Sequence, residues 1–140
     1  MKVCIVGAGA IGGWIGVKLA RAGHSVSVLA RGAALSAIKQ NGLQLIEGGE
    51  SYAAKVHTAG AASEHETPDL LVIAVKAPGL RDAALAVAPL VGSNTTVLTA
   101  MNGVPWWFFD RADRPLAGAQ LATIDATGEI AKSIPSRNVI

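Results

Sequence analysis

The chain has 140 residues, enough for one compact domain with a hydrophobic core and too few for two domains of ordinary size. Apolar residues make up 51% of it and charged residues 16%, a globular composition that excludes an intrinsically disordered chain. The net charge is +2 and the 12 lysines and arginines are scattered along the sequence, so we expect no nucleic-acid partner.

The N-terminal third of the chain predicts a β-α-β unit. Residues 2–6 form a short β-rich apolar run, which indicates a buried strand. Residues 10–22 have the period of a helix, with an apolar face that begins with Ile11 and Ile15. A second strand is predicted over residues 25–30. A unit of this kind implies a parallel sheet.

The middle of the chain continues to alternate between strands and helices. The expected elements are a helix over residues 33–40, two short strands around 48–49, a buried strand over 69–75, a helix over 80–90 and a strand over 95–100. Together they predict an α/β fold of the Rossmann type, doubly wound, with a mainly parallel sheet in the strand order 3-2-1-4-5 and helices on both faces.

The C-terminal part of the chain is less regular. Residues 104–110 are expected to open a helix, and residues 116–134 to form one short strand and a helix that ends before Pro135. Residues 139–140 look like the start of another buried strand. We therefore interpret the sequence as a Rossmann-type sheet truncated before its last strands, and as a fragment of a longer chain.

Four consecutive aromatic residues stand at positions 106–109. One face of a helix cannot bury all four. At least one ring is therefore expected to remain exposed, where it would cover a substrate cleft or face a part of the protein outside this chain.

Residues 7–12 read GAGAIG, a G-x-G-x-x-G motif between the first predicted strand and the following helix. In this setting the motif is typical of a dinucleotide-binding turn. Gly7 would allow the tight turn, Gly9 would let the backbone approach a pyrophosphate, and Gly12 would let the helix pack closely on the strand. A glycine-rich turn without a ligand is the alternative. The residues predicted to contact the cofactor here are Gly7, Ala8, Gly9, Ala10, Ile11 and Gly12.

Arg31 stands at the end of the second predicted strand. An acidic residue at this place accepts hydrogen bonds from the ribose hydroxyls of NAD, whereas an arginine accommodates the 2′-phosphate of NADP. No acidic residue occurs from Ser25 to Gln40, so the sequence favours NADP(H) and disfavours FAD. A solvated arginine at a strand end is the alternative.

Lys76 and Asn102 follow two further predicted strands. In doubly wound sheets, ligands bind beyond the carboxyl ends of the strands, beside the first strand. With the strand order 3-2-1-4-5, both side chains would emerge next to the glycine motif. Each alone is better explained as a solvated strand end, but their convergence predicts a shared role in binding cofactor and substrate.

Four motifs in this order resemble the N-terminal domain of the ketopantoate reductase (2-dehydropantoate 2-reductase) family. They are VGAGAIGG, the strand-end Arg31, VKA at 75–77 and NG at 102–103, and the resemblance covers nearly all 140 residues. It implies that Arg31 holds the 2′-phosphate and that Lys76 and Asn102 face the nicotinamide ribose and the substrate. It also implies reduction of a 2-oxo acid, such as 2-dehydropantoate, to the 2-hydroxy acid with NADPH in the pantothenate pathway.

The resemblance further implies that the catalytic lysine and an assisting glutamate lie in a helical C-terminal domain, which this chain does not contain. We therefore assign no catalytic residue, and interpret residues 1–140 as an NADP(H)-binding domain that is not catalytically competent alone. The segment PWWFF is bulkier than the family usually shows after NG, so the substrate stays open. The alternatives are an NADP(H)-sensing module without catalysis and a related reductase for a different keto acid.

The expected partner is a small 2-oxo acid, with no membrane, and a homodimer through the C-terminal domain is left open. The apolar stretch of residues 3–17 is too short to span a bilayer and contains five glycines, so we do not interpret it as a signal peptide and expect a cytoplasmic protein.

The lone Cys4 is interpreted as a buried strand residue. His24, His57 and His65 lack the spacing of metal ligands and are interpreted as turn and surface residues, so no metal is expected.

Overall fold

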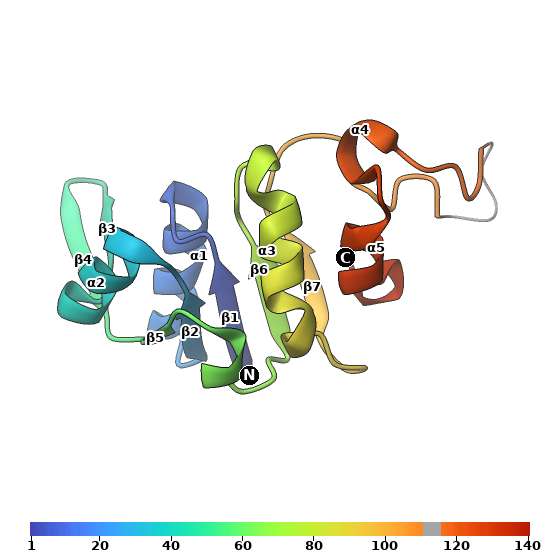
Figure 1. Cartoon of the computed structure of the whole chain (residues 1–140). Coiled ribbons are helices and arrows are strands. Elements are labelled where there is room, and N and C mark those ends of the chain that lie inside the picture. The colour runs from blue at the N-terminus through green and yellow to red at the C-terminus, as the bar shows by residue number, and fades with distance from the viewer. Residues whose placement is uncertain (111–115) are drawn as a thin grey trace.

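The computed structural model describes residues 1–110 and 116–140, which form an α/β fold (Figure 1). Its main sheet is parallel, with the strand order β5-β2-β1-β6-β7. Counted along the chain within this sheet, the order is 3-2-1-4-5, so the predicted Rossmann-type topology is confirmed. The strands are β1 (Lys2–Val6), β2 (Ser25–Leu29), β5 (His57–Ala59), β6 (Leu70–Ile73) and β7 (Thr96–Thr99).

The helices of the described residues are α1 (Ala10–Arg21), α2 (Gly32–Asn41), α3 (Leu80–Val87), α4 (Ala122–Asp125) and α5 (Glu129–Ser133). Successive residues of a strand point to opposite faces of its sheet. In β1, Val3 packs in the core cluster that contains Val17 of α1, whereas Cys4 packs in the cluster that contains Ala84 of α3. Helices therefore cover both faces, as predicted. Short 3₁₀ helices lie at Ala62–Glu64, Ala77–Gly79, Ala88–Leu90 and Ser136–Asn138.

A separate hairpin, β3 (Leu43–Glu47) and β4 (Glu50–Ala54), confirms the two strands expected around residues 48–49. Gly48 and Gly49 have φ angles of +61° and +84°, which a two-residue hairpin turn of the favoured twist requires. The hairpin lies against α1, where the indole Nε1 of Trp14 donates a hydrogen bond of 2.8 Å to Glu47. The hairpin thus extends the layer that covers one face of the sheet.

The buried face of α1 differs from the predicted one. Ile11 is 58% exposed and Ile15 is only half-buried, whereas the buried residues of α1 are Gly12, Gly13, Gly16 and Val17. The helix approaches the sheet and the hairpin so closely that a Cβ at Gly16 would lie 2.7 Å from Cδ1 of Leu43. Close approach, rather than apolar side-chain volume, determines which face is buried.

Residues 104–110 do not form the predicted helix. They form turns, in which the backbone N–H of Phe108 donates to the carbonyl of Pro105 at 3.1 Å and that of Asp110 to the carbonyl of Trp107 at 3.0 Å. The expected exposure of an aromatic ring is confirmed, because Phe108 is 54% exposed. Trp106 is buried, and its indole Nε1 donates a hydrogen bond of 3.3 Å to the carbonyl of Ile134.

The segment from 116 to 134 contains two short helices, α4 and α5, and no strand, so the predicted strand there is wrong. Conversely, strand β5 is present but was not predicted, because its three residues show no alternation of apolar and polar side chains. The expectation for residues 139–140 is met in part. Val139 forms a single parallel bridge with Val97 of β7, and the backbone N–H of Ile140 donates to the carbonyl of Val97 at 3.0 Å.

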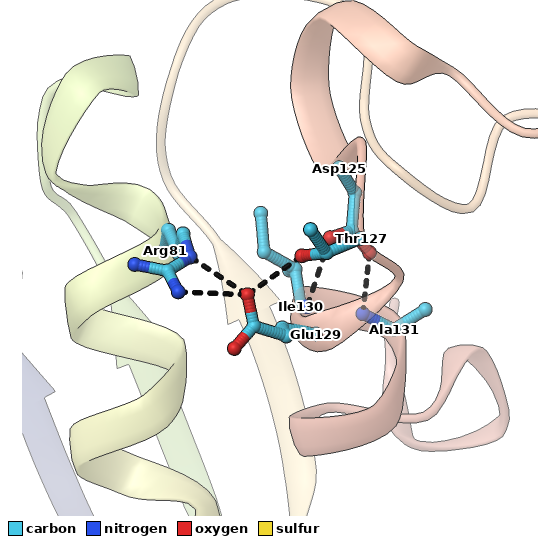
Figure 2. Close-up of polar contacts among 6 residues, drawn as sticks. All are labelled: Arg81, Asp125, Thr127, Glu129, Ile130 and Ala131. Carbon is cyan, nitrogen blue, oxygen red and sulfur yellow. Dashed lines mark hydrogen bonds and ion pairs between the residues drawn. The ribbon is translucent and has the colours of Figure 1, made fainter.

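Helix α5 is fixed against α3 by polar contacts at its N-terminus (Figure 2). The buried carboxylate of Asp125 accepts hydrogen bonds from the backbone N–H groups of Ile130 at 3.1 Å and Ala131 at 2.9 Å. Two guanidinium nitrogens of Arg81 on α3 lie 2.9 and 2.8 Å from one oxygen of Glu129. Ile130 is buried under this network, so the segment that follows residue 116 belongs to the domain core.

His65 is half-buried, so its interpretation as a surface residue is wrong. Its ring packs edge-on against the ring of His57, with a centroid separation of 5.1 Å. Burial lowers the pKa of His65 below its ordinary value, because removal from water disfavours the charged imidazolium.

The lowered pKa of His65 predicts a loss of stability in acid. As the pH falls below about 6.5, the unfolded chain binds a proton that the folded chain takes up only at lower pH, so the free energy of unfolding decreases. Urea unfolding at pH 7.5, 6 and 5 should show this decrease, and His65→Gln should reduce its slope. His24→Gln is the control. Equal slopes in the wild type and His65→Gln would contradict the assignment.

Candidate functional site

The turn between β1 and α1 requires glycine at its first position. Gly7 has a φ of +91°, and a Cβ there would lie 2.7 Å from the carbonyl oxygen of Ala74 and 2.9 Å from Cγ1 of Val75. The segment after β6 therefore touches the glycine motif directly. This contact brings the carboxyl ends of β1 and β6 to a single point at the edge of the sheet.

Gly12 is buried at the base of the same turn, and a Cβ there would lie 2.1 Å from the carbonyl oxygen of Gly7. Gly9 is different, because it is exposed and a Cβ there would meet no atom within 4 Å. The open space at Gly9 is where a ligand can approach the backbone. The close packing predicted at Gly12 is thus observed, while Gly9 leaves free the space that the predicted approach of a ligand would need.

The N-terminus of α1 offers unpaired donors. Its N-cap is Gly9, which has no side chain to accept a hydrogen bond, and its first turn contains no acidic residue. Ala10 and Ile11 are exposed, and their backbone N–H groups precede the first intrahelical donor, the N–H of Gly13, which bonds the Gly9 carbonyl at 2.7 Å. Free N–H groups together with the helix dipole favour an anion at this end of α1.

A cleft of about 270 Å³ joins the glycine motif to Arg31. Gly7 and Ala8 line one side of it, and Arg31, at the N-cap of α2, lines another. Among the residues that the structure describes, no carboxylate pairs with the exposed guanidinium of Arg31. The structure thus brings together two elements that sequence analysis assigned to one ligand, and leaves a cation available there.

Helix α3 supplies a wall of this cleft that the sequence did not predict. Asp82, Ala83 and Ala86 line it, and Gly60 after β5 lines its floor. No local signal marks these residues, because they reach the cleft only through the pairing of β1 with β6. Asp82 also stands in the first turn of α3, where an acidic residue complements the helix dipole.

Lys76 and Asn102 leave neighbouring strands at the same edge of the sheet. β6 and β7 are paired, and the backbone N–H of Ala100 donates to the carbonyl of Ile73 at 2.8 Å. Both side chains are exposed. Asn102 lines a second cleft, of about 390 Å³, whose wall includes Ala77, the residue after Lys76. The first cleft is lined by Val75, so Lys76 lies on the segment that runs between the two clefts.

The glycine motif lines the first cleft, and among the described residues the two clefts share no lining residue. Arg31 lines the first cleft, Asn102 lines the second, and Lys76 lies on the segment between them. In residues 1–110 and 116–140, no group of three or more histidine, cysteine, aspartate or glutamate side chains is arranged to hold a metal ion. The helices in these same ranges are too short or too polar to cross a bilayer.

Comparison with known proteins gives consistent matches. Residues 3–105 match the family described as ketopantoate reductase PanE/ApbA. A 2-dehydropantoate 2-reductase of Mesorhizobium japonicum is 48% identical over the whole chain. A candidate ketopantoate reductase from Ralstonia solanacearum MolK2 superposes on 98% of the chain with a TM-score of 0.94 and 49% identity. A D-mandelate dehydrogenase, solved with NADH and anilino(oxo)acetate, superposes on 99% of it with a TM-score of 0.74 and 28% identity.

The chain spans less than half the length of these relatives. It covers 43% of the Mesorhizobium protein, 42% of the Ralstonia chain and 39% of the D-mandelate dehydrogenase chain. The similarity therefore concerns one part of each relative.

Proposed function

Because the chain belongs to the ketopantoate reductase PanE/ApbA family, we propose that it forms the NADPH-binding part of an oxidoreductase that reduces a 2-oxo acid to a 2-hydroxy acid. The observation that carries the proposal is the cleft shared by the glycine motif and Arg31, with the uncapped end of α1 directly after the glycine turn. A dinucleotide needs this combination of a backbone cradle for its pyrophosphate and a surface on either side.

The residues of this chain would bind and orient the cofactor. The loop at Gly7 and Gly9 and the first turn of α1 would hold the pyrophosphate, and Arg31 would hold the 2′-phosphate. Lys76 and Asn102 would face the nicotinamide ribose and the substrate. When bound, NADPH supplies a hydride for the keto carbon. The group that protonates the keto oxygen is assigned to a part of the protein beyond Ile140.

Two alternatives compete with this proposal, one for the cofactor and one for the function. A structural neighbour binds NADH, so NADH is the competing cofactor, and the unpaired Arg31 is the reason to favour NADPH. A sensing module without catalysis is the competing function. A sensor has no need of the second cleft at Asn102, which supports a reductase.

We assign the reaction to the cytoplasm, where NADPH is available and a lone buried thiol such as Cys4 stays reduced.

Steady-state kinetics would test this function. The full-length protein that contains this sequence should oxidise one NADPH for each molecule of 2-oxo acid that it reduces. The loss of NADPH absorbance would measure this turnover. The 140-residue chain alone should bind NADPH weakly and show no turnover with 2-dehydropantoate.

Two results would contradict the proposal. Steady turnover by the purified 140-residue chain would mean that the catalytic groups lie within residues 1–140. NADPH binding by the complete polypeptide without reduction of any 2-oxo acid would favour the sensing module.

A further inference from the structure

One face of α3 forms a wall of the first cleft. The wall consists of Gly79, which is the N-cap of α3, and of Asp82, Ala83 and Ala86. These positions have the i, i+3, i+4, i+7 spacing of a single helical face. Apart from Asp82 they are glycine and alanine, so a flat ring can approach the helix closely there. We call this face the α3 wall.

The carboxylate of Asp82 is available to a ligand. Asp82 is exposed, and among the residues that the structure describes no lysine, arginine or histidine forms an ion pair with it. Its neighbour Arg81 is directed toward α5, where the guanidinium bonds Glu129 (Figure 2). Arg31 lines the same cleft without pairing with Asp82. The first cleft thus offers one cation and one separate hydrogen-bond acceptor.

The proposed cofactor contacts determine where the base of a bound dinucleotide lies. They put its pyrophosphate at the glycine turn and its 2′-phosphate at Arg31. The ribose that carries the 2′-phosphate also carries the base, on the adjacent carbon. The base therefore enters the remaining part of the first cleft, which is lined by Ala34 of α2, by Gly60 and by the α3 wall. Of these described residues, Asp82 alone has a polar side chain.

A carboxylate distinguishes the groups on the edge of a purine. It only accepts hydrogen bonds, and so do the unprotonated ring nitrogens of adenine, whereas the 6-amino group of the base donates. In nucleic-acid recognition, aspartate and glutamate bind the exocyclic amine of cytosine in the same way. We propose that Asp82 recognises the base of the cofactor, because its carboxylate accepts a hydrogen bond from the 6-amino group of adenine. The proposal rests on the proposed function and adds the residue that selects the base.

An analogue of NADP in which hypoxanthine replaces adenine tests this role. Hypoxanthine has a 6-oxo group in place of the amino group, an acceptor that a carboxylate repels. Isothermal titration calorimetry of the full-length protein that contains this sequence should show that NADP binds about tenfold more tightly than the analogue. This factor lies near the lower end of the range for a hydrogen bond to a charged group, because water competes at an exposed position.

Asp82→Asn and Asp82→Ala should both remove this preference. An amide accepts from the 6-amino group and donates to the 6-oxo group, and alanine bonds to neither. The loss of a negative charge in the cleft strengthens the binding of both dinucleotides alike, so the ratio of the two dissociation constants isolates the effect on the base. Glu50→Gln removes an exposed carboxylate outside both clefts and should keep the preference of the wild type.

Two results would overturn the inference while the proposed function stands. If the wild type binds the analogue as tightly as NADP, or more tightly, its carboxylate does not select the amino group. If both Asp82 variants keep the preference, the base is selected elsewhere and Asp82 serves only the helix dipole of α3. Failure of the wild type to bind either dinucleotide contradicts the proposed function itself, and the inference falls with it.

Discussion

Replacing Gly12 with alanine should destabilise the protein by about 2–3 kcal/mol, although alanine normally favours a helix over glycine by about 1 kcal/mol. The added Cβ would lie 2.1 Å from the carbonyl oxygen of Gly7 and 3.1 Å from Cβ of Ala74. Both atoms belong to ordered backbone segments, the first to the turn between β1 and α1 and the second to the segment after β6. Either α1 or the turn must move, and urea unfolding would measure the cost.

Two neighbouring glycines are matched controls. Gly13→Ala should be neutral or slightly stabilising, because its Cβ would have only the Ala8 carbonyl oxygen nearby, at 3.8 Å. Gly9→Ala should fold normally, because nothing lies within 4 Å of its Cβ, but should bind NADPH more weakly. If Gly12→Ala unfolds at the same urea concentration as Gly13→Ala, the close packing of α1 on the turn is not needed for stability.

Replacing Arg31 with alanine should remove most of a preference for NADPH over NADH of about ten- to hundredfold. The guanidinium offers a planar fork of donors to a 2′-phosphate, and a hydrogen bond to a charged group contributes about 1.5–3 kcal/mol. Each 1.4 kcal/mol corresponds to a tenfold change in affinity. NADH has only a hydroxyl at this position, so its binding should change little.

Titration of both cofactors against both proteins measures the effect of Arg31. Lys39→Ala is the matched control, since Lys39 is an exposed cation in the last turn of α2, outside the cleft. It should leave the preference for NADPH intact. Equal losses of NADH and NADPH in Arg31→Ala would mean that Arg31 supports the fold rather than the phosphate.

Most element boundaries could be predicted because their signals are local, whereas the strand order was predicted from the fold type that these elements and the glycine motif indicate. The apolar runs of β1 and β6 each indicate a buried strand, and the glycines at 48 and 49 indicate a hairpin turn, all within a few residues. The turns at 104–110 could not be predicted in the same way. There the burial of Trp106 depends on a carbonyl in residue 134, and such a tertiary contact overrides the local preference for a helix.

The candidate site also contains residues that the sequence could predict and residues that it could not. The glycine motif and Arg31 carry recognisable sequence signals, and the structure places them in one cleft. Asp82 and Ile124 carry none, because they reach the two clefts through the packing of α3 and α4. The exposure of Ile11 could not be predicted either. Helical periodicity identifies an apolar face, but three glycines on another face let the sheet approach there instead.

The pairing of β1 with β6 also determines the order in which the domain can assemble. The hairpin of β3 and β4 joins residues close in sequence, whereas the backbone N–H of Lys2, at the start of β1, bonds to Asp69 across 67 residues. Closing a long loop costs more entropy than closing a short one, and parallel pairing of distant segments is slow. Gly7 meets Ala74 only after this closure. We therefore expect the turn at Gly7 to reach its final geometry late in folding, after the hairpin and the first β-α-β unit have formed.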